Sequence, residues 1–225
     1  PAEDRARRVA PDRHHRHAAI PGGAERADLP RAGRAQLRRL YLAHGAGAGM
    51  HHPFMTALSN ELAAHHVGTL RFNFPFTEQK KKRPDVPAVA HKTIEVAIQK
   101  ANELFPNVPL FAGGKSFGGR MTSQYVSKQN LNELSGVVFV GFPLHPPGKP
   151  SLERADHLKE VRLPMLFLQG TRDALAQWEL IEQMTSSLPL ASLIKIEGAD
   201  HGFKVAKQNS IPVLAMHCKQ WMENF

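Results

Sequence analysis

The chain of 225 residues contains one cysteine, Cys218, and no long apolar run. A single cysteine excludes an internal disulfide and a zinc site built from cysteines. No apolar stretch approaches the roughly 20 residues that span a bilayer, and the first residues lack the apolar core of a signal peptide. From these absences we expect a cytoplasmic protein that has no membrane partner.

Residues 1–40 contain no lysine and no aromatic residue, but they hold ten arginines against five acidic residues. This segment therefore carries more than half of the formal net charge of +9. The segment also contains only a handful of large aliphatic side chains. These cannot bury enough apolar surface to offset the entropy of ordering the chain. We expect an arm over residues 1–38 that is disordered or outside the fold, followed by one domain over 39–225. The domain has no strong basic bias, and its basic residues have no clustered aromatic residues near them, so we expect no nucleic-acid partner.

From residue 40 onward, short apolar runs alternate with helical patterns, which predicts a parallel sheet with crossover helices. Six runs have the composition of buried strands: 40–45, 67–74, 108–114, 135–144, 163–170 and 191–198. Apolar residues at helical spacing lie between these runs and again near the C-terminus. The expected fold is a mostly parallel, doubly wound α/β sheet.

The segment PLFAGGKSFGGR, residues 109–120, allows two interpretations of Ser116. A phosphate-binding loop requires a glycine where this chain has Pro109, which has no N–H to donate. The alternative is G-x-S-x-G, a tight turn between a buried strand and a helix that presents a nucleophilic serine. The apolar run before Ser116 and the glycines after it match this second pattern. Ser116 is therefore the candidate nucleophile.

A serine in such a turn works with an acid and then a histidine, in that chain order, at the ends of later strands. Asp173 follows the run 163–170, and His201 follows the run 191–198. We therefore predict Asp173 as the acid and His201 as the base. Asp200 is the rival acid, but the side chains of adjacent residues in extended backbone diverge, so we expect it to shape the loop.

Two backbone N–H groups are the candidate oxyanion hole. Phe117 opens the helix after the serine, where the N–H groups and the helix dipole favour negative charge. The second donor is expected from the turn AHGAGAGMHH, residues 43–52, whose small residues allow close approach of the backbone. We predict the Ala46 N–H, with Gly47 as the alternate. His44 in such a turn is expected to bond backbone groups and not to act as a base.

Two pairs of adjacent histidines, 51–52 and 65–66, raise the question of a metal site. Neither pair has the i, i+4 spacing that places two imidazoles on one helix face, and neither has a carboxylate nearby to complete a ligand set. We expect no metal and no cofactor.

The blocks GGKSFGGRM, GFPLHPPGKP, PMLFLQGTRDAL and EGADHGF resemble the bacterial branch of the α/β-hydrolase-like family that includes testis-expressed protein thirty and a subunit of the NSL histone-acetyltransferase complex. The chain is more distantly similar to dienelactone hydrolases. The resemblance runs from about residue 40 to the C-terminus and implies an α/β-hydrolase fold with a minimal lid or none. It also implies Ser116, Asp173 and His201 as a catalytic triad. The family's opening edge strands have no counterpart in the pattern before residue 40.

These observations predict a serine hydrolase of small esters or thioesters, whose partner is a small acyl substrate. The alternative is a non-catalytic interaction module that keeps the fold by inheritance. The residue pattern fixes neither the acyl group nor the oligomeric state.

Overall fold

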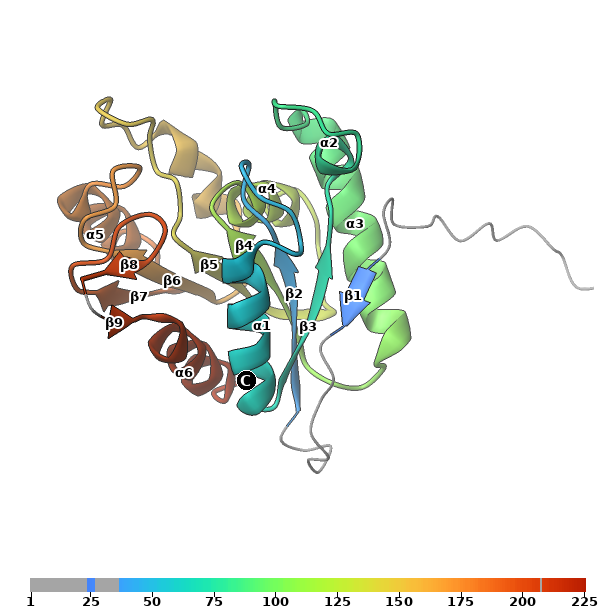
Figure 1. Ribbon diagram of the computed structural model, residues 1–225. Helices are drawn as coiled ribbons and strands as arrows, with labels where there is room; N and C mark the ends of the chain where they lie inside the picture. Colours follow the sequence, from blue (N-terminus) through green and yellow to red (C-terminus); the bar gives the residue numbers. More distant parts are fainter. Residues whose placement is uncertain (1–23, 27–36, 207) are drawn as a thin grey trace, which may run out of the picture.

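The computed structural model describes residues 24–26, 37–206 and 208–225, and it shows a central sheet with helices on both faces (Figure 1). The parallel strands of this sheet are β2 (Arg38–Ala43), β3 (Val67–Phe72), β4 (Leu110–Lys115), β5 (Leu134–Val140), β6 (Met165–Gly170) and β7 (Ala191–Ile196). With β1 (Ala24–Arg26), the strand order is β1-β3-β2-β4-β5-β6-β7. This order confirms the predicted mostly parallel, doubly wound α/β fold.

Helices divide between the two faces of the sheet: α1 (Pro53–Ala64) and α6 (Ile211–Met222) cover one face, and α3 (Pro87–Leu104), α4 (Phe117–Val126) and α5 (Trp178–Ser186) cover the other. Alternate side chains of a strand point to opposite faces. In β2, Leu40 and Leu42 therefore pack in the cluster that contains α1 and α6, whereas Tyr41 and Ala43 pack in the cluster that contains α3, α4 and α5. Strands β2 to β6 are buried on both faces, which explains their nearly continuous apolar runs.

Prolines mark the start of three helices, because proline at the first helical position lacks only an N–H that would have no intrahelical partner. These helices are α1, the short α2 (Pro75–Glu78) and α3. The connection between β5 and β6 carries a 3₁₀ helix, η2 (Glu153–Glu160), which packs against α4. Within the described ranges, no helix is long and apolar enough to cross a membrane.

The strand β1 corrects one expectation. It pairs antiparallel with β3, with Ala24 opposite Phe72 and Arg26 opposite Leu70. It lies inside the arm 1–38, where no strand was expected. An edge strand is held by backbone hydrogen bonds along one side, so the sequence Ala-Glu-Arg carries no apolar signal for it. Arg38 also belongs to the fold as the first residue of β2, and the remaining arm residues up to 36 lie outside the described residues.

Candidate active site

Ser116 stands alone between the end of β4 and the start of α4. Its backbone has φ 51° and ψ −117°, a conformation that residues other than glycine rarely adopt. Its N–H donates to the Val140 carbonyl at 3.2 Å, and its carbonyl accepts from the Arg120 N–H at 3.1 Å. The surrounding sheet and helix therefore hold this strained turn, which is the predicted strand–serine–helix geometry.

Small residues next to Ser116 allow α4 to approach β2. A Cβ atom on Gly118 would lie 2.6 Å from the His44 carbonyl oxygen and 2.7 Å from the Ala43 carbonyl carbon. Such contacts are too short for any side chain, so only glycine fits at this position. The start of α4 is thereby brought against the turn that follows β2.

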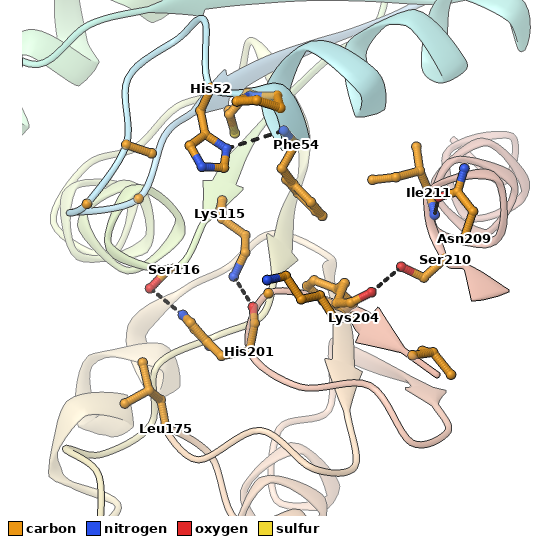
Figure 2. A pocket seen from close by; sticks show the side chains of 18 of the residues that line it. His52, Phe54, Lys115, Ser116, Leu175, His201, Lys204, Asn209, Ser210 and Ile211 are labelled. Carbon is orange, nitrogen blue, oxygen red and sulfur yellow. Dashed lines mark hydrogen bonds between the residues drawn. The ribbon is translucent and has the colours of Figure 1, made fainter. Parts of the chain in front are cut away.

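His201 lies between Ser116 and Asp173 and contacts both side chains. Its Nε2 is 2.8 Å from Ser116 Oγ, and its Nδ1 is 2.7 Å from Asp173 Oδ2. Figure 2 shows the ring of His201 directed at Ser116, with the hydrogen bond between them dashed. The Asp173 side chain is 1% exposed and that of His201 is 26% exposed, so the acid is buried while the histidine reaches the pocket. Sequence reasoning placed these three residues at strand ends, and the fold brings them into one hydrogen-bonded row.

The Asp173 carboxylate is fixed by two further donors. The Gln169 amide, on β6, donates to Oδ2 at 2.6 Å, and the Leu175 N–H donates to Oδ1 at 2.8 Å. Gln169 in turn accepts from the Phe142 N–H at 2.9 Å and is fully buried. Sequence reasoning missed Gln169, because one polar residue in an apolar strand has no distinguishing spacing.

Asp200 has a different role from Asp173. Its Oδ1 accepts the Lys204 N–H at 2.9 Å, and its backbone carbonyl accepts the Phe203 N–H at 2.9 Å. These bonds close the turn that carries His201, as expected for a residue that shapes the loop.

The turn after β2 is held by side chains of the neighbouring segment. His44 is fully buried; its Nδ1 bonds the Gly45 carbonyl at 2.8 Å, and its Nε2 accepts the Phe74 N–H at 3.1 Å. Burial lowers the pKa of His44, which favours the neutral ring that this bonding requires. His44 is thus structural, as predicted.

Farther along this turn, both backbone groups of Met50 are bonded by β3 and the residue after it. The Arg71 guanidinium donates to the Met50 carbonyl at 2.6 Å, and the Asn73 side chain accepts the Met50 N–H at 2.7 Å. The turn therefore presents Ala46, the predicted oxyanion donor, on an anchored backbone at the wall of the pocket. The other predicted donor, Phe117, is the first residue of α4. Among the described residues, neither of these two N–H groups donates to another backbone carbonyl.

Ser116 and His201 line a cavity of about 810 Å³. Its apolar wall comes from the start of α1, the loop after β6, the residue before β8 (Lys204–Val205), β8 itself, which pairs with β9 (Gln208–Asn209), and the start of α6: Phe54, Met55, Leu175, Phe203, Val205 and Ile211. Lys115, Lys204 and His52 also line the cavity, and among the described residues that line it there is no aspartate or glutamate. The cavity can take a small, largely apolar molecule against the serine.

In the part of the chain that the structure describes, no group of three histidine, cysteine or acidic side chains is arranged to hold a metal ion. The buried Cys218 lies in the core cluster with α6.

The structure combines a buried parallel sheet with a serine in the turn after β4, an aspartate after β6 and a histidine after β7. This is an α/β hydrolase architecture with a serine-hydrolase-like site. The chain matches the model of the alpha/beta hydrolase domain family over residues 36–224, and it belongs to that family.

Solved structures share this fold at low sequence identity. Est1E from Butyrivibrio proteoclasticus with bound ferulic acid is 14% identical, with a TM-score of 0.67 over 90% of this chain and 94% of that one. Dienelactone hydrolase from Anabaena variabilis is 16% identical, with a TM-score of 0.69 over 88% and 89% of the two chains. XC6422 from Xanthomonas campestris, described as a serine hydrolase without a lid, is 18% identical, with a TM-score of 0.65 over 89% and 91%. At these identities the likeness shows the fold alone.

Proposed function

We propose that this protein is a serine hydrolase that cleaves small esters or thioesters through an acyl-enzyme. The observation that carries the proposal is the position of His201, with one ring nitrogen 2.8 Å from Ser116 Oγ and the other 2.7 Å from a buried aspartate. A hydroxyl is a weak nucleophile until an adjacent base accepts its proton. A base oriented by a third group is the arrangement that such catalysis needs.

In the first half of the proposed reaction, Ser116 Oγ attacks the carbonyl carbon of the substrate while His201 Nε2 accepts the hydroxyl proton. Asp173 accepts the hydrogen bond of Nδ1–H, which keeps the ring in the required tautomer and stabilises the imidazolium. The N–H groups of Ala46 and Phe117 bind the negative oxygen of the tetrahedral intermediate. The imidazolium then protonates the departing alcohol or thiol, which leaves the acyl group on Ser116.

In the second half, water attacks the acyl-enzyme. His201 accepts a proton from the water as its oxygen adds to the acyl carbon, and then returns that proton to Ser116 Oγ as the acid leaves. His201 acts as base and acid in turn, and the reaction consumes one water per ester.

The size and lining of the cavity support a small acyl substrate. A volume of about 810 Å³ with apolar walls suits a compact acyl group better than a polymer. Solved structures of similar fold include an esterase domain from Rhodothermus marinus and a monoacylglycerol lipase from Paleococcus ferrophilus. Their names support ester hydrolysis as the reaction class to test first.

Steady-state hydrolysis of short p-nitrophenyl esters by the wild type and by Ser116→Ala tests the proposal. We expect the alanine variant to lose roughly four to six orders of magnitude in kcat, because it has no nucleophile. Circular dichroism and thermal unfolding check that the variant is folded. Turnover by Ser116→Ala at the wild-type rate would disprove the assignment of the nucleophile.

A further inference from the structure

Lys115 is the last residue of β4 and directly precedes Ser116, yet the proposed reaction assigns it no role. Its ammonium donates to the backbone carbonyl of His201 at 2.5 Å, a contact that joins residues 86 positions apart (Figure 2). The same nitrogen lies 5.3 Å from the ring centre of Phe203 and 6.0 Å from that of Phe54. The side chain therefore spans from the nucleophile's strand to the loop that carries the base.

Gly141, at the end of β5, locates the ammonium relative to the imidazole. A Cβ atom built on Gly141 would lie 3.1 Å from Lys115 Nζ and 3.6 Å from His201 Nδ1. The Lys115 ammonium and the His201 ring therefore both lie next to Gly141. Gly141 also has φ +71°, a conformation that disfavours any side chain, so the space is kept for the lysine.

We propose that Lys115 is a positioning residue of the active site: its ammonium holds the His201 backbone so that the imidazole stays aligned between Ser116 and Asp173. The inference rests on the proposed hydrolase function. A charge-assisted hydrogen bond in a partly buried site is stronger than a neutral one. The bond also fixes the loop at the residue whose side chain must move a proton.

Asp173 and Asp200 act electrostatically on the Lys115 ammonium, and Lys204 and His52 line the same cavity. Asp173 lies on the loop after β6, Asp200 lies on the His201 loop, Lys204 begins β8, and His52 precedes α1. Burial lowers the pKa of the Lys115 ammonium to about 8, while the Asp173 and Asp200 carboxylates act against this shift. The ammonium therefore loses its charge as the pH rises through this value, and with it the charge-assisted bond weakens.

The first test compares Lys115→Met with the wild type in ester hydrolysis. Misplacing a catalytic group by about 1 Å can cost on the order of 100-fold in rate, so we expect kcat to fall roughly 10- to 100-fold. KM should change far less, because Lys115 does not hold the substrate. The wild-type kcat should decline above about pH 8, and Lys115→Met should lack this decline.

Chemical rescue distinguishes the ammonium from the mere bulk of the side chain. In Lys115→Cys, alkylation with bromoethylamine joins the thiol to an aminoethyl group and releases bromide, which rebuilds an ammonium of nearly the original length. The native Cys218 is buried and burial raises the pKa of its thiol to about 12, so it should not react. We expect the aminoethylated protein to regain most of the lost kcat, and the same variant treated with iodoacetamide to regain none.

Lys195→Met is the matched control, because Lys195 is on the strand that leads to His201 but pairs with Glu197 and does not line the cavity. It should keep the wild-type kcat and pH profile. An unchanged kcat in Lys115→Met, or equal activity after the two alkylations, would overturn the proposal while leaving the hydrolase function intact.

Amide hydrogen exchange over residues 199–204 provides a readout that does not depend on turnover. Faster exchange in Lys115→Met than in the wild type and Lys195→Met is the expected result, because the loop loses its anchor. If the wild type hydrolyses no ester, the proposed function fails, and exchange alone decides the anchoring role. Unchanged exchange would then overturn it.

Discussion

At the scale of single residues, the two aspartates near His201 differ in every contact. Asp173 is buried, accepts from Gln169 and the Leu175 N–H, and meets the imidazole at Nδ1. The carboxylate of Asp200 instead accepts a backbone N–H within its own turn. These contacts place the carboxylate of Asp173, and not that of the adjacent Asp200, against the His201 ring.

Asparagine substitutions test this difference directly. Asp173→Asn keeps the size of the side chain but cannot balance an imidazolium and favours the wrong tautomer, a change that costs about 10⁴ in kcat in a known triad. We expect a loss of that order near neutral pH, with KM little changed. Asp200→Asn should cost less than roughly 10-fold, because it leaves the contact between Asp173 and His201 in place. Steady-state kinetics of both variants decide the matter, and the reverse ranking would make Asp200 the acid.

The residues of the proposed triad could be predicted from sequence because each follows a buried strand in the required chain order. Lys115 and Gln169 could not be assigned roles in this way. Each contacts a backbone group that is remote in the chain. A single lysine or glutamine in a strand has no characteristic spacing from other residues that would mark it in the sequence. Only the fold shows that Lys115 reaches the His201 carbonyl.

At the scale of elements, the site depends on how closely α4 approaches the turn after β2. Gly118 sets this approach, because any Cβ there would collide with the backbone of Ala43 and His44. We expect Gly118→Ala to lower the free energy of unfolding by about 1 to 3 kcal/mol, as overpacking does. It should also lower kcat, because the Ser116 turn and the Ala46 backbone would shift apart.

Urea unfolding of Gly118→Ala beside Gly47→Ala measures the first effect. A Cβ on Gly47 would meet nothing within 4 Å, so that variant should unfold close to the wild type. Equal stability of the two variants would show that the close approach of α4 is not required.

The elements that sequence reasoning found and missed differ in how they are held. Strands β2 to β6 bury almost every residue and the edge strand β7 is half-buried, and the apolar runs predict all six within a few residues. The strand β1 and the β8–β9 hairpin are short and polar, and they are held by backbone pairing. The start of a helix is also hard to predict from apolar spacing. Helix α3 starts at Pro87, whereas the regular apolar spacing of its sequence begins only at Ile94.

At the scale of the whole molecule, the parallel topology of the sheet brings the residues of the candidate site together. The carboxyl ends of β4, β6 and β7 lie at one edge of the sheet, so the loops after them bring Ser116, Asp173 and His201 together. The start of α1 and the β8–β9 hairpin then enclose the cavity above the serine. The strand β1 lies within the arm expected over residues 1–38, and it pairs with β3 at the other side of the sheet from β6 and β7.

If Ser116 is an activated nucleophile, it should react with a fluorophosphonate probe. Such a probe reacts covalently with an activated serine and not with an ordinary hydroxyl. We predict a single adduct on the folded protein, mapped to Ser116 by peptide mass spectrometry and lost in His201→Ala. A folded wild-type protein that takes no label, or takes it at another residue, would contradict the account; the absence of any label would favour a non-catalytic interaction module.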